Sequence, residues 1–117
     1  LKICFAHGGG ALPYLQGRVQ QAFKYYPSDM QTKTQIEPET FLRNNPNITA
    51  DTILHNSDAL KFALNFYGKE SLLLGSDYPF LLGEHCPGEL ITNTADIEPE
   101  VKRKLLAGNA LRFFDCC

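Results

Sequence analysis

The chain has 117 residues and a net charge of −2, with acidic and basic side chains interspersed. Its length suits one domain, its 44% hydrophobic content predicts a packed core, and it carries no basic stripe that would bind nucleic acid. Its apolar runs are far shorter than a membrane span and its start shows no signal-peptide pattern, so we expect a cytoplasmic protein without nucleic-acid or membrane partners.

A short apolar run opens the chain and predicts a buried strand over 1–7, which ends in His7 and is followed by the triple glycine 8–10. Cys4 lies inside this strand, where we expect a free thiol that behaves as a small hydrophobic residue. Apolar residues at helical spacing then predict a helix over 13–25.

The rest of the chain alternates between predicted loops, helices and strands: a loop over 26–37, a short helix over 38–43, a strand over 48–54, a helix over 58–67, a strand over 71–75, and helices over 100–107 and 109–114. Ser57 is the expected N-cap of the central helix and Gly68 its end, whereas Gly108 is expected to separate the last two helices. Repeated strand–helix units imply parallel strands, so the predicted fold class is α/β with three βα units.

Three residues that can carry out chemistry lie at or just past the predicted strand ends: His7, His55 and Asp77. Since the carboxyl ends of parallel strands meet at one edge of a sheet, these side chains are expected to share a pocket. Histidine suits proton transfer near neutral pH, and an aspartate can bind a metal ion or orient a base. The alternative is that both histidines are hydrogen-bonded structural residues and that Asp77 is a turn residue.

The four cysteines, Cys4, Cys86, Cys116 and Cys117, show no C-x-x-C spacing. We expect all four to be reduced, and their spacing does not support a zinc site built from cysteines. The chain starts inside a predicted strand without a methionine, which we interpret as the sign of a C-terminal piece of a longer protein.

Several segments, in this order and at this spacing, resemble the amidohydrolase superfamily: FAHGGG at 5–10, GR at 17–18, DTILH at 51–55, LGSDYPF at 74–80, LGE at 82–84, PG at 87–88 and KLLAGNAL at 104–111. The resemblance covers essentially the whole chain. It implies a metal-dependent (β/α)8 barrel, of which residues 1–117 would be the incomplete C-terminal part with the sixth, seventh and eighth strands. The superfamily's H-x-H metal pair and its strand-five histidine ligand have no counterpart in this sequence.

The resemblance also implies roles for individual residues. His7 matches a catalytic histidine, and Asp77 matches an aspartate that binds zinc or another divalent metal. Arg18 matches an arginine that binds the substrate carboxylate in the neighbouring subunit of a homodimer. His55 matches a histidine of open role and is a candidate for a supporting position behind the metal. The implied activity of the full-length enzyme is decarboxylation of a small carboxylated substrate.

Two alternatives stay open. The full-length protein could be another decarboxylase or a hydrolase of the same superfamily, or the chain could be an inactive truncated product that acts at most by pairing with intact subunits. Zinc needs about four ligands, or three and a water. We therefore expect the 117 residues alone to bind zinc weakly and not to decarboxylate.

Overall fold

The computed structural model describes residues 1–26 and 36–116. In chain order, its elements are β1 (Ile3–Phe5), a 3-10 turn (His7–Gly9), α1 (Leu12–Tyr25), α3 (Pro38–Leu42), β2 (Ile48–Asp51), α4 (Ser57–Tyr67), β3 (Leu72–Leu73), α5 (Glu89–Asn93), α6 (Pro99–Arg103), a π-helical segment (Lys104–Gly108) and α7 (Asn109–Phe113). The predicted helices over 13–25 and 38–43 are confirmed by α1 and α3. Most of the predicted loop over 26–37 lies outside the described residues.

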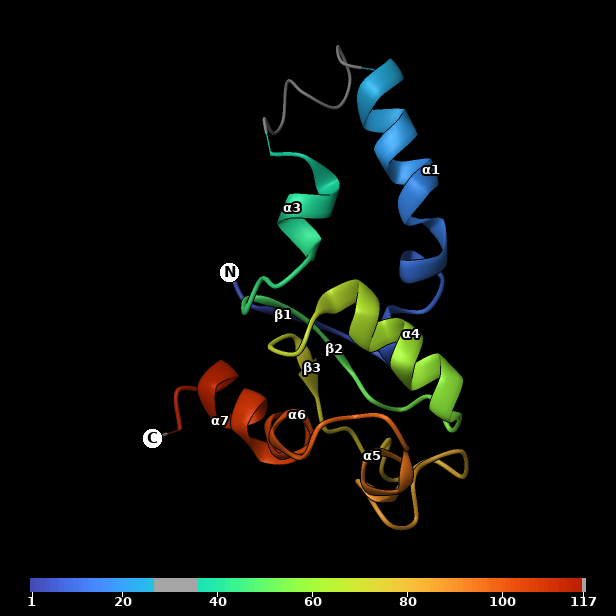
Figure 1. The fold of residues 1–117 in the computed structure, drawn as a ribbon, viewed down its shortest axis with the longest axis vertical. Coiled ribbons are helices and arrows are strands. Elements are labelled where there is room, and N and C mark those ends of the chain that lie inside the picture. Colours follow the sequence, from blue (N-terminus) through green and yellow to red (C-terminus); the bar gives the residue numbers. More distant parts are fainter. Residues whose placement is uncertain (27–35, 117) are drawn as a thin grey trace.

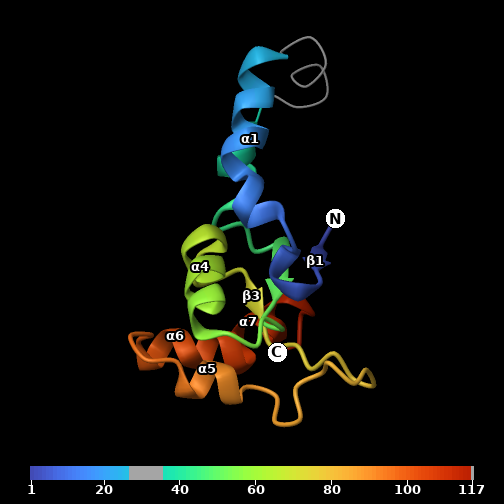
Figure 2. The ribbon, with the colours of Figure 1, turned by 90° about the vertical axis from the view of Figure 1, so that its right-hand side faces the viewer.

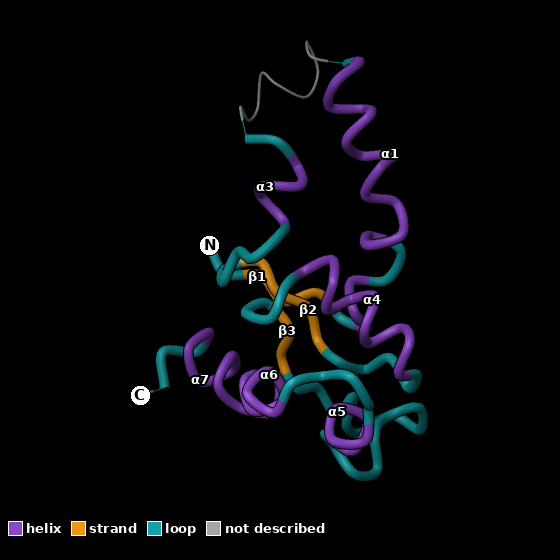
Figure 3. The backbone as a smooth tube through the Cα atoms, viewed as in Figure 1, coloured by secondary structure: helices purple, strands orange, loops and turns teal. Residues whose placement is uncertain are grey.

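The three strands form one parallel sheet in the order β1-β2-β3. Ile3 pairs with Ile48 in the first ladder, and Ala50 pairs with Leu72 in the second. The sheet lies at the centre of the molecule, with α4 beside it and α5, α6 and α7 at the opposite end from α1 (Figure 3). The predicted α/β class with parallel strands is therefore confirmed.

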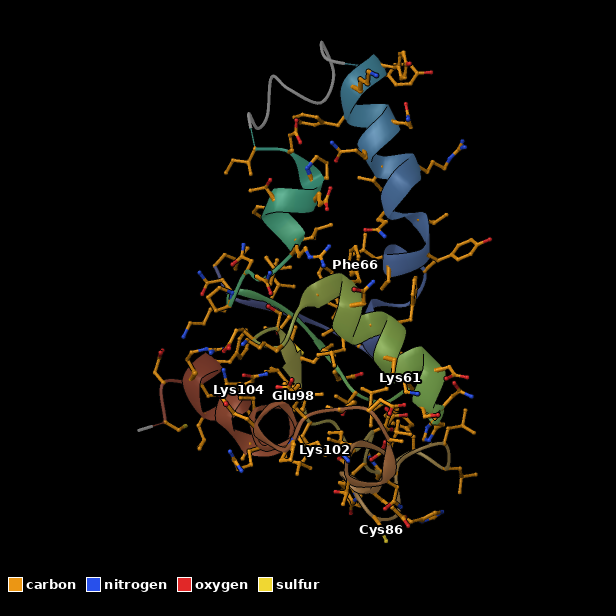
Figure 4. All side chains as sticks on the ribbon, viewed as in Figure 1. Lys61, Phe66, Cys86, Glu98, Lys102 and Lys104 are labelled. Carbon is orange, nitrogen blue, oxygen red and sulfur yellow. The ribbon has the colours of Figure 1, made fainter. Side chains whose placement is uncertain are left out.

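Helices α1 and α3 form an arm that extends away from the sheet in both views (Figures 1 and 2). The arm makes the molecule elongated, with extents of 47 × 30 × 29 Å. Phe66 of α4 lies at the base of the arm (Figure 4) and lines a cavity of about 270 Å³ together with residues of α1 and α3. None of the helices in the described ranges has the length and apolar composition needed to cross a membrane.

The core lies between the sheet and its helices, and its buried residues come from every part of the body: Ala50, Leu60, Ala63, Phe66, Tyr67, Leu72, Ile91, Ile97 and Leu105. Helix α4 supplies the largest share because its apolar residues recur at helical spacing. Its N-cap is Asn56, whose Oδ1 accepts the N–H groups of Asp58 and Ala59 at 2.9 Å each. The predicted cap at Ser57 was therefore wrong by one residue, whereas Gly68 ends the helix as predicted, with φ of 84°.

All three predicted strands are shorter in the structure than expected. The buried strand predicted over 1–7 is reduced to β1, which is only partly buried, and His7 lies in the turn that follows it. The strand predicted over 48–54 ends at Asp51, because the Asp51 carboxylate accepts the N–H of Ile53 at 3.0 Å and turns the chain out of the ladder. The strand predicted over 71–75 is reduced to β3. Cys4 is exposed rather than buried, because side chains alternate along a strand and its neighbour Phe5 is the one that packs against the core.

The C-terminal helices were predicted with a break at Gly108, which the structure contradicts. Gly108 has helical angles, φ −57° and ψ −40°, so the chain passes from α6 through the π-helical segment into α7 without a stop. Asn109 is not a cap: it is fully buried, and its Nδ2 donates to the carbonyls of Lys69 and Leu72 at 2.9 Å each. Helix α5 was not predicted.

Candidate active site

His7 lies directly after β1, in a turn that doubles back over the end of the sheet. The residue is exposed and has φ of 53°, in the left-handed region, and Gly8 follows with φ of 61°. A left-handed conformation costs a residue with a Cβ about 1–2 kcal/mol, whereas glycine adopts it freely. The triple glycine therefore permits the sharp turn that presents His7 at the edge of the sheet.

Residues of the β2–α4 unit bind and pack against this turn. The N–H of Gly8 donates to Asp51 Oδ1 at 3.1 Å. A Cβ on Gly8 would lie 2.5 Å from Leu54 Cδ2, and one on Gly9 would lie 1.9 Å from the Tyr67 hydroxyl. Both glycines are thus packed too closely against neighbouring side chains to be replaced without movement.

Two titratable side chains near this turn have raised pKa values. Burial raises the pKa of Tyr67 to about 12, with a smaller contribution from Cys4. Desolvation also raises the pKa of Cys4; a hydrogen bond with Thr49 opposes this increase and the Asp51 charge adds to it. Both groups therefore stay protonated at neutral pH. The Tyr67 hydroxyl is buried and has no hydrogen-bond partner among the described residues.

Asp77 lies on the other side of β2, in the segment that follows β3. It is half-buried and left-handed, with φ of 56°. Its carbonyl accepts the N–H of Phe80 at 2.9 Å, and the carbonyl of Ser76 accepts the N–H of Glu84 at 2.9 Å. Gly83 packs against this turn so closely that a Cβ would lie 2.7 Å from the Ser76 oxygen. The Asp77 turn is therefore held by its own following loop.

His55, after β2, is exposed and is the third left-handed residue at a strand end, with φ of 52°. It lines a cavity of about 390 Å³ with residues of the loop before α5 and of α5 itself: Gly83, Glu84, His85, Cys86, Glu89, Leu90 and Asn93. His55 thus faces the loop that follows Asp77, which fits a supporting position better than a central one.

Arg18 does not lie at the edge of the sheet with His7 and Asp77. It is exposed on α1, in the arm, and forms no ion pair within the part of the chain that the structure describes. The structure thus brings the turns of His7 and Asp77 to one edge of the sheet, on either side of β2, and places Arg18 elsewhere.

A metal ion would need more ligands than this edge offers. Residues 1–26 and 36–116 contain no group of three or more His, Cys, Asp and Glu side chains placed to hold one. Asp77 can supply one carboxylate ligand, and zinc takes about four ligands in total. The described residues therefore make part of a metal site at most.

Sequence reasoning missed Asp51 and Tyr67, which together with Leu54 contact the His7 turn from the β2–α4 unit. Asp51 stands in the DTILH segment at 51–55, directly at the end of an apolar strand. A carboxylate in that position is a signal that could have been used, since strand ends gather the residues of a site. Nothing in the pattern around Tyr67 distinguishes it from an ordinary core residue of an amphipathic helix.

Comparison with known proteins places these features in context. The family model described as amidohydrolase matches residues 1–116. A 2-amino-3-carboxymuconate-6-semialdehyde decarboxylase from Dictyostelium discoideum is 40% identical over 113 residues, which is 97% of this chain and 31% of that protein. The Caenorhabditis elegans protein of the same name is 35% identical over 115 residues, 98% of this chain and 28% of its own length.

A solved structure shows the same fold. The 5-carboxyvanillate decarboxylase of Novosphingobium aromaticivorans, complexed with manganese and a nitrobenzoic acid, matches with a TM-score of 0.74 and 22% identity, over 98% of this chain and 33% of that one. The chain spans less than a third of the length of the two curated relatives. The three βα units therefore correspond to part of a barrel.

Proposed function

The chain belongs to the amidohydrolase family, and from this premise we propose that the whole protein is a metal-dependent decarboxylase of 2-amino-3-carboxymuconate-6-semialdehyde. The proposal includes a place in the kynurenine branch of tryptophan degradation, in the cytoplasm. Its main support is that two curated relatives with this name match nearly the whole chain. The structural observation that carries it is the placement of the His7 and Asp77 turns at one edge of the sheet.

We assign Asp77 as one ligand of a divalent metal, with the other ligands supplied from outside the described residues. Zinc is the expected metal, and the manganese in the structural neighbour supports a divalent ion of either kind. Such an ion acts as a Lewis acid at a carboxylated substrate.

His7 is the proposed proton-transfer group. Its exposed position at the end of β1 leaves the imidazole open to a substrate, and imidazole exchanges protons readily near neutral pH. Decarboxylation of an unsaturated acid needs a proton delivered to carbon when carbon dioxide leaves. We propose that His7 holds and moves this proton.

Arg18 is the proposed substrate-carboxylate residue, acting in the neighbouring subunit of a homodimer. The arm formed by α1 and α3 projects from the body (Figures 1 and 2), so a guanidinium on α1 can reach a site other than its own. The planar fork of arginine is well shaped for a carboxylate. In such a dimer, the arm of each subunit would place its Arg18 guanidinium at the substrate site of the other subunit.

The test is to compare His7→Ala, Asp77→Ala and His85→Ala in the whole protein, measuring carbon dioxide release and bound metal by elemental analysis. His7→Ala should keep its metal and lose about 100- to 10,000-fold in turnover. Asp77→Ala should lose metal, and the exposed His85 serves as the matched histidine control. Full turnover of His7→Ala, or full metal content of Asp77→Ala, would contradict the assigned role.

A second candidate keeps the fold and changes the substrate to an aromatic carboxylic acid. The likeness to a 5-carboxyvanillate decarboxylase favours it as the alternative. A panel that offers the wild-type protein the muconate semialdehyde and 5-carboxyvanillate side by side separates the two. Faster turnover of the aromatic acid would replace the first proposal with the second.

A further inference from the structure

We infer that Asp51 is a positioning residue that fixes the His7 turn to the sheet. It is the last residue of β2, and its Oδ1 accepts two backbone N–H groups, that of Gly8 at 3.1 Å and that of Ile53 at 3.0 Å. One bond turns its own chain out of the strand, and the other joins the end of β2 to the turn after β1. The inference rests on the proposed role of His7 in proton transfer.

The turn needs an anchor outside itself. Its own hydrogen bonds, from Gly9 N–H to the Ala6 carbonyl and from Gly10 N–H to the His7 carbonyl, are 3.0 Å long and purely local. They shape the turn but do not join it to the sheet, and the packing of Gly8 on Leu54 and of Gly9 on Tyr67 is not directional. The Asp51 bond adds a directional link to the end of β2, and an ionised acceptor makes it about twice as strong as a neutral one.

Thr52, the next residue along the chain, makes a similar hydrogen bond on the other side of β2. Thr52 is buried, and its Oγ1 accepts the N–H of Gly75 at 3.4 Å, in the segment that leads from β3 to Asp77. The last side chain of β2 and the one that follows it thus bind the segments after both neighbouring strands. Asp51 acts on the segment of His7 and Thr52 on the segment of Asp77, so a change at each should disturb a different peptide.

The chain itself shows that one amide oxygen can accept two backbone N–H groups. Asn56 Oδ1 accepts two successive backbone N–H groups at 2.9 Å, as Asp51 Oδ1 accepts two. Asp51→Asn should therefore keep both hydrogen bonds and lose only the charge. If Asp51 acts by positioning, this variant should have the turnover of wild type. If the Asp51 charge acts on His7 instead, the variant should lose turnover and show a shifted pH profile.

The experiment compares Asp51→Ala, Asp51→Asn and Thr52→Val in the whole protein, first by hydrogen–deuterium exchange of the peptide that spans 5–11. Loss of a hydrogen bond to a charged acceptor should speed exchange of the Gly8 amide about 10-fold in Asp51→Ala. Asp51→Asn should exchange at the wild-type rate. Thr52→Val should leave this peptide unchanged and loosen the one that spans 74–78 instead.

Steady-state kinetics supply the second measurement. A catalytic group that moves by about 1 Å can cost about 100-fold, so Asp51→Ala should lower kcat by about 10- to 100-fold with KM and metal content little changed. Asp51→Asn should recover kcat and keep the wild-type pH profile.

Two results would overturn the inference: wild-type exchange of the 5–11 peptide in Asp51→Ala, or an Asp51→Asn variant as slow as Asp51→Ala with a displaced pH profile. A wild-type protein without decarboxylase turnover would refute the proposed function instead. The exchange measurement then still decides whether Asp51 fixes the turn, so the two failures are distinguishable.

Discussion

Substitution of Gly9 by alanine should damage the His7 turn in a way that the structure allows us to calculate. Gly9 has φ of 80°, and its added Cβ would lie 1.9 Å from the Tyr67 hydroxyl, which is fully buried. A left-handed alanine costs about 1–2 kcal/mol. Overpacking a well-packed site costs a further ~1–3 kcal/mol. We expect Gly9→Ala to lower the free energy of unfolding by about 2–5 kcal/mol.

Two further variants separate these contributions. Gly10 has φ of 57° and ψ of −124°, outside the left-handed helical region, and nothing lies within 4 Å of an added Cβ, so Gly10→Ala should show a backbone cost without a steric clash. Tyr67→Phe removes the oxygen that the new Cβ would strike. Since that hydroxyl has no partner among the described residues, its removal should be neutral or stabilising by about 1 kcal/mol. Gly9→Ala made in Tyr67→Phe should then cost less than in wild type, although more than the backbone cost alone, because the new Cβ would still lie 3.1 Å from ring carbon Cζ.

Urea unfolding of wild type, the single variants and the double variant measures this cycle, since contacting residues show a coupling energy that distant ones lack. An equal loss from Gly9→Ala in both backgrounds would show that the alanine and the hydroxyl do not meet. Strong destabilisation by Tyr67→Phe alone would show that the hydroxyl has a hydrogen-bond partner in the whole protein. Either result would refute the reasoning.

Two other predictions concern parts of the fold away from this turn. Hydrogen bonds from Lys104 and Arg112 hold the pKa of Glu70 below its usual range. The ionised carboxylate therefore stabilises the folded state fully above the unfolded-state pKa, and this stabilisation is lost as the pH falls through the lowered pKa of the folded state. The difference in urea midpoint between wild type and Glu70→Gln should therefore be largest near neutral pH and vanish in acid; a constant difference would argue against the ion pairs. Asn56→Ala should cost about 1 kcal/mol in thermal or urea unfolding, and Ser57→Ala should cost little. A larger loss of stability from Ser57→Ala than from Asn56→Ala would indicate that Ser57 is the N-cap.

The sequence allowed the fold class to be predicted because the pattern of apolar residues survives in the structure. Helix α1 occupies Leu12–Tyr25, close to the predicted 13–25, and the parallel sheet follows from the repeated strand–helix order. Predicted element boundaries were wrong where a tertiary contact overrides the local conformational preference of a residue. Gly108 stays helical because Asn109 is tied to β3 through the Leu72 carbonyl, a partner 37 residues away.

The positions of two candidate site residues, though not their roles, could be predicted for a similar reason. His7 and Asp77 follow apolar runs, so a rule about strand ends locates them at one edge of the sheet. Asp51 and Tyr67 could not be assigned in this way, since their importance lies in what they contact across the sheet. The hydrogen bond between Gly8 and Asp51 joins residues 43 positions apart, and periodicity carries no information about it.

The three candidate residues at the strand ends share a backbone conformation that is uncommon for residues with a Cβ. His7, His55 and Asp77 are all left-handed, with φ of 53°, 52° and 56°. Glycine would make each turn without the cost of about 1–2 kcal/mol that a Cβ brings, and this chain uses glycine for such turns elsewhere, as at Gly88 with φ of 92°. Yet Asn44, Asp96 and Asp115 share this conformation away from the candidate site, with φ of 52°, 63° and 55°. Asn, Asp and His adopt it more readily than other residues with a Cβ, so the backbone angle alone does not separate a functional side chain from a turn residue. The turnover and metal content of His7→Ala and Asp77→Ala decide between the two.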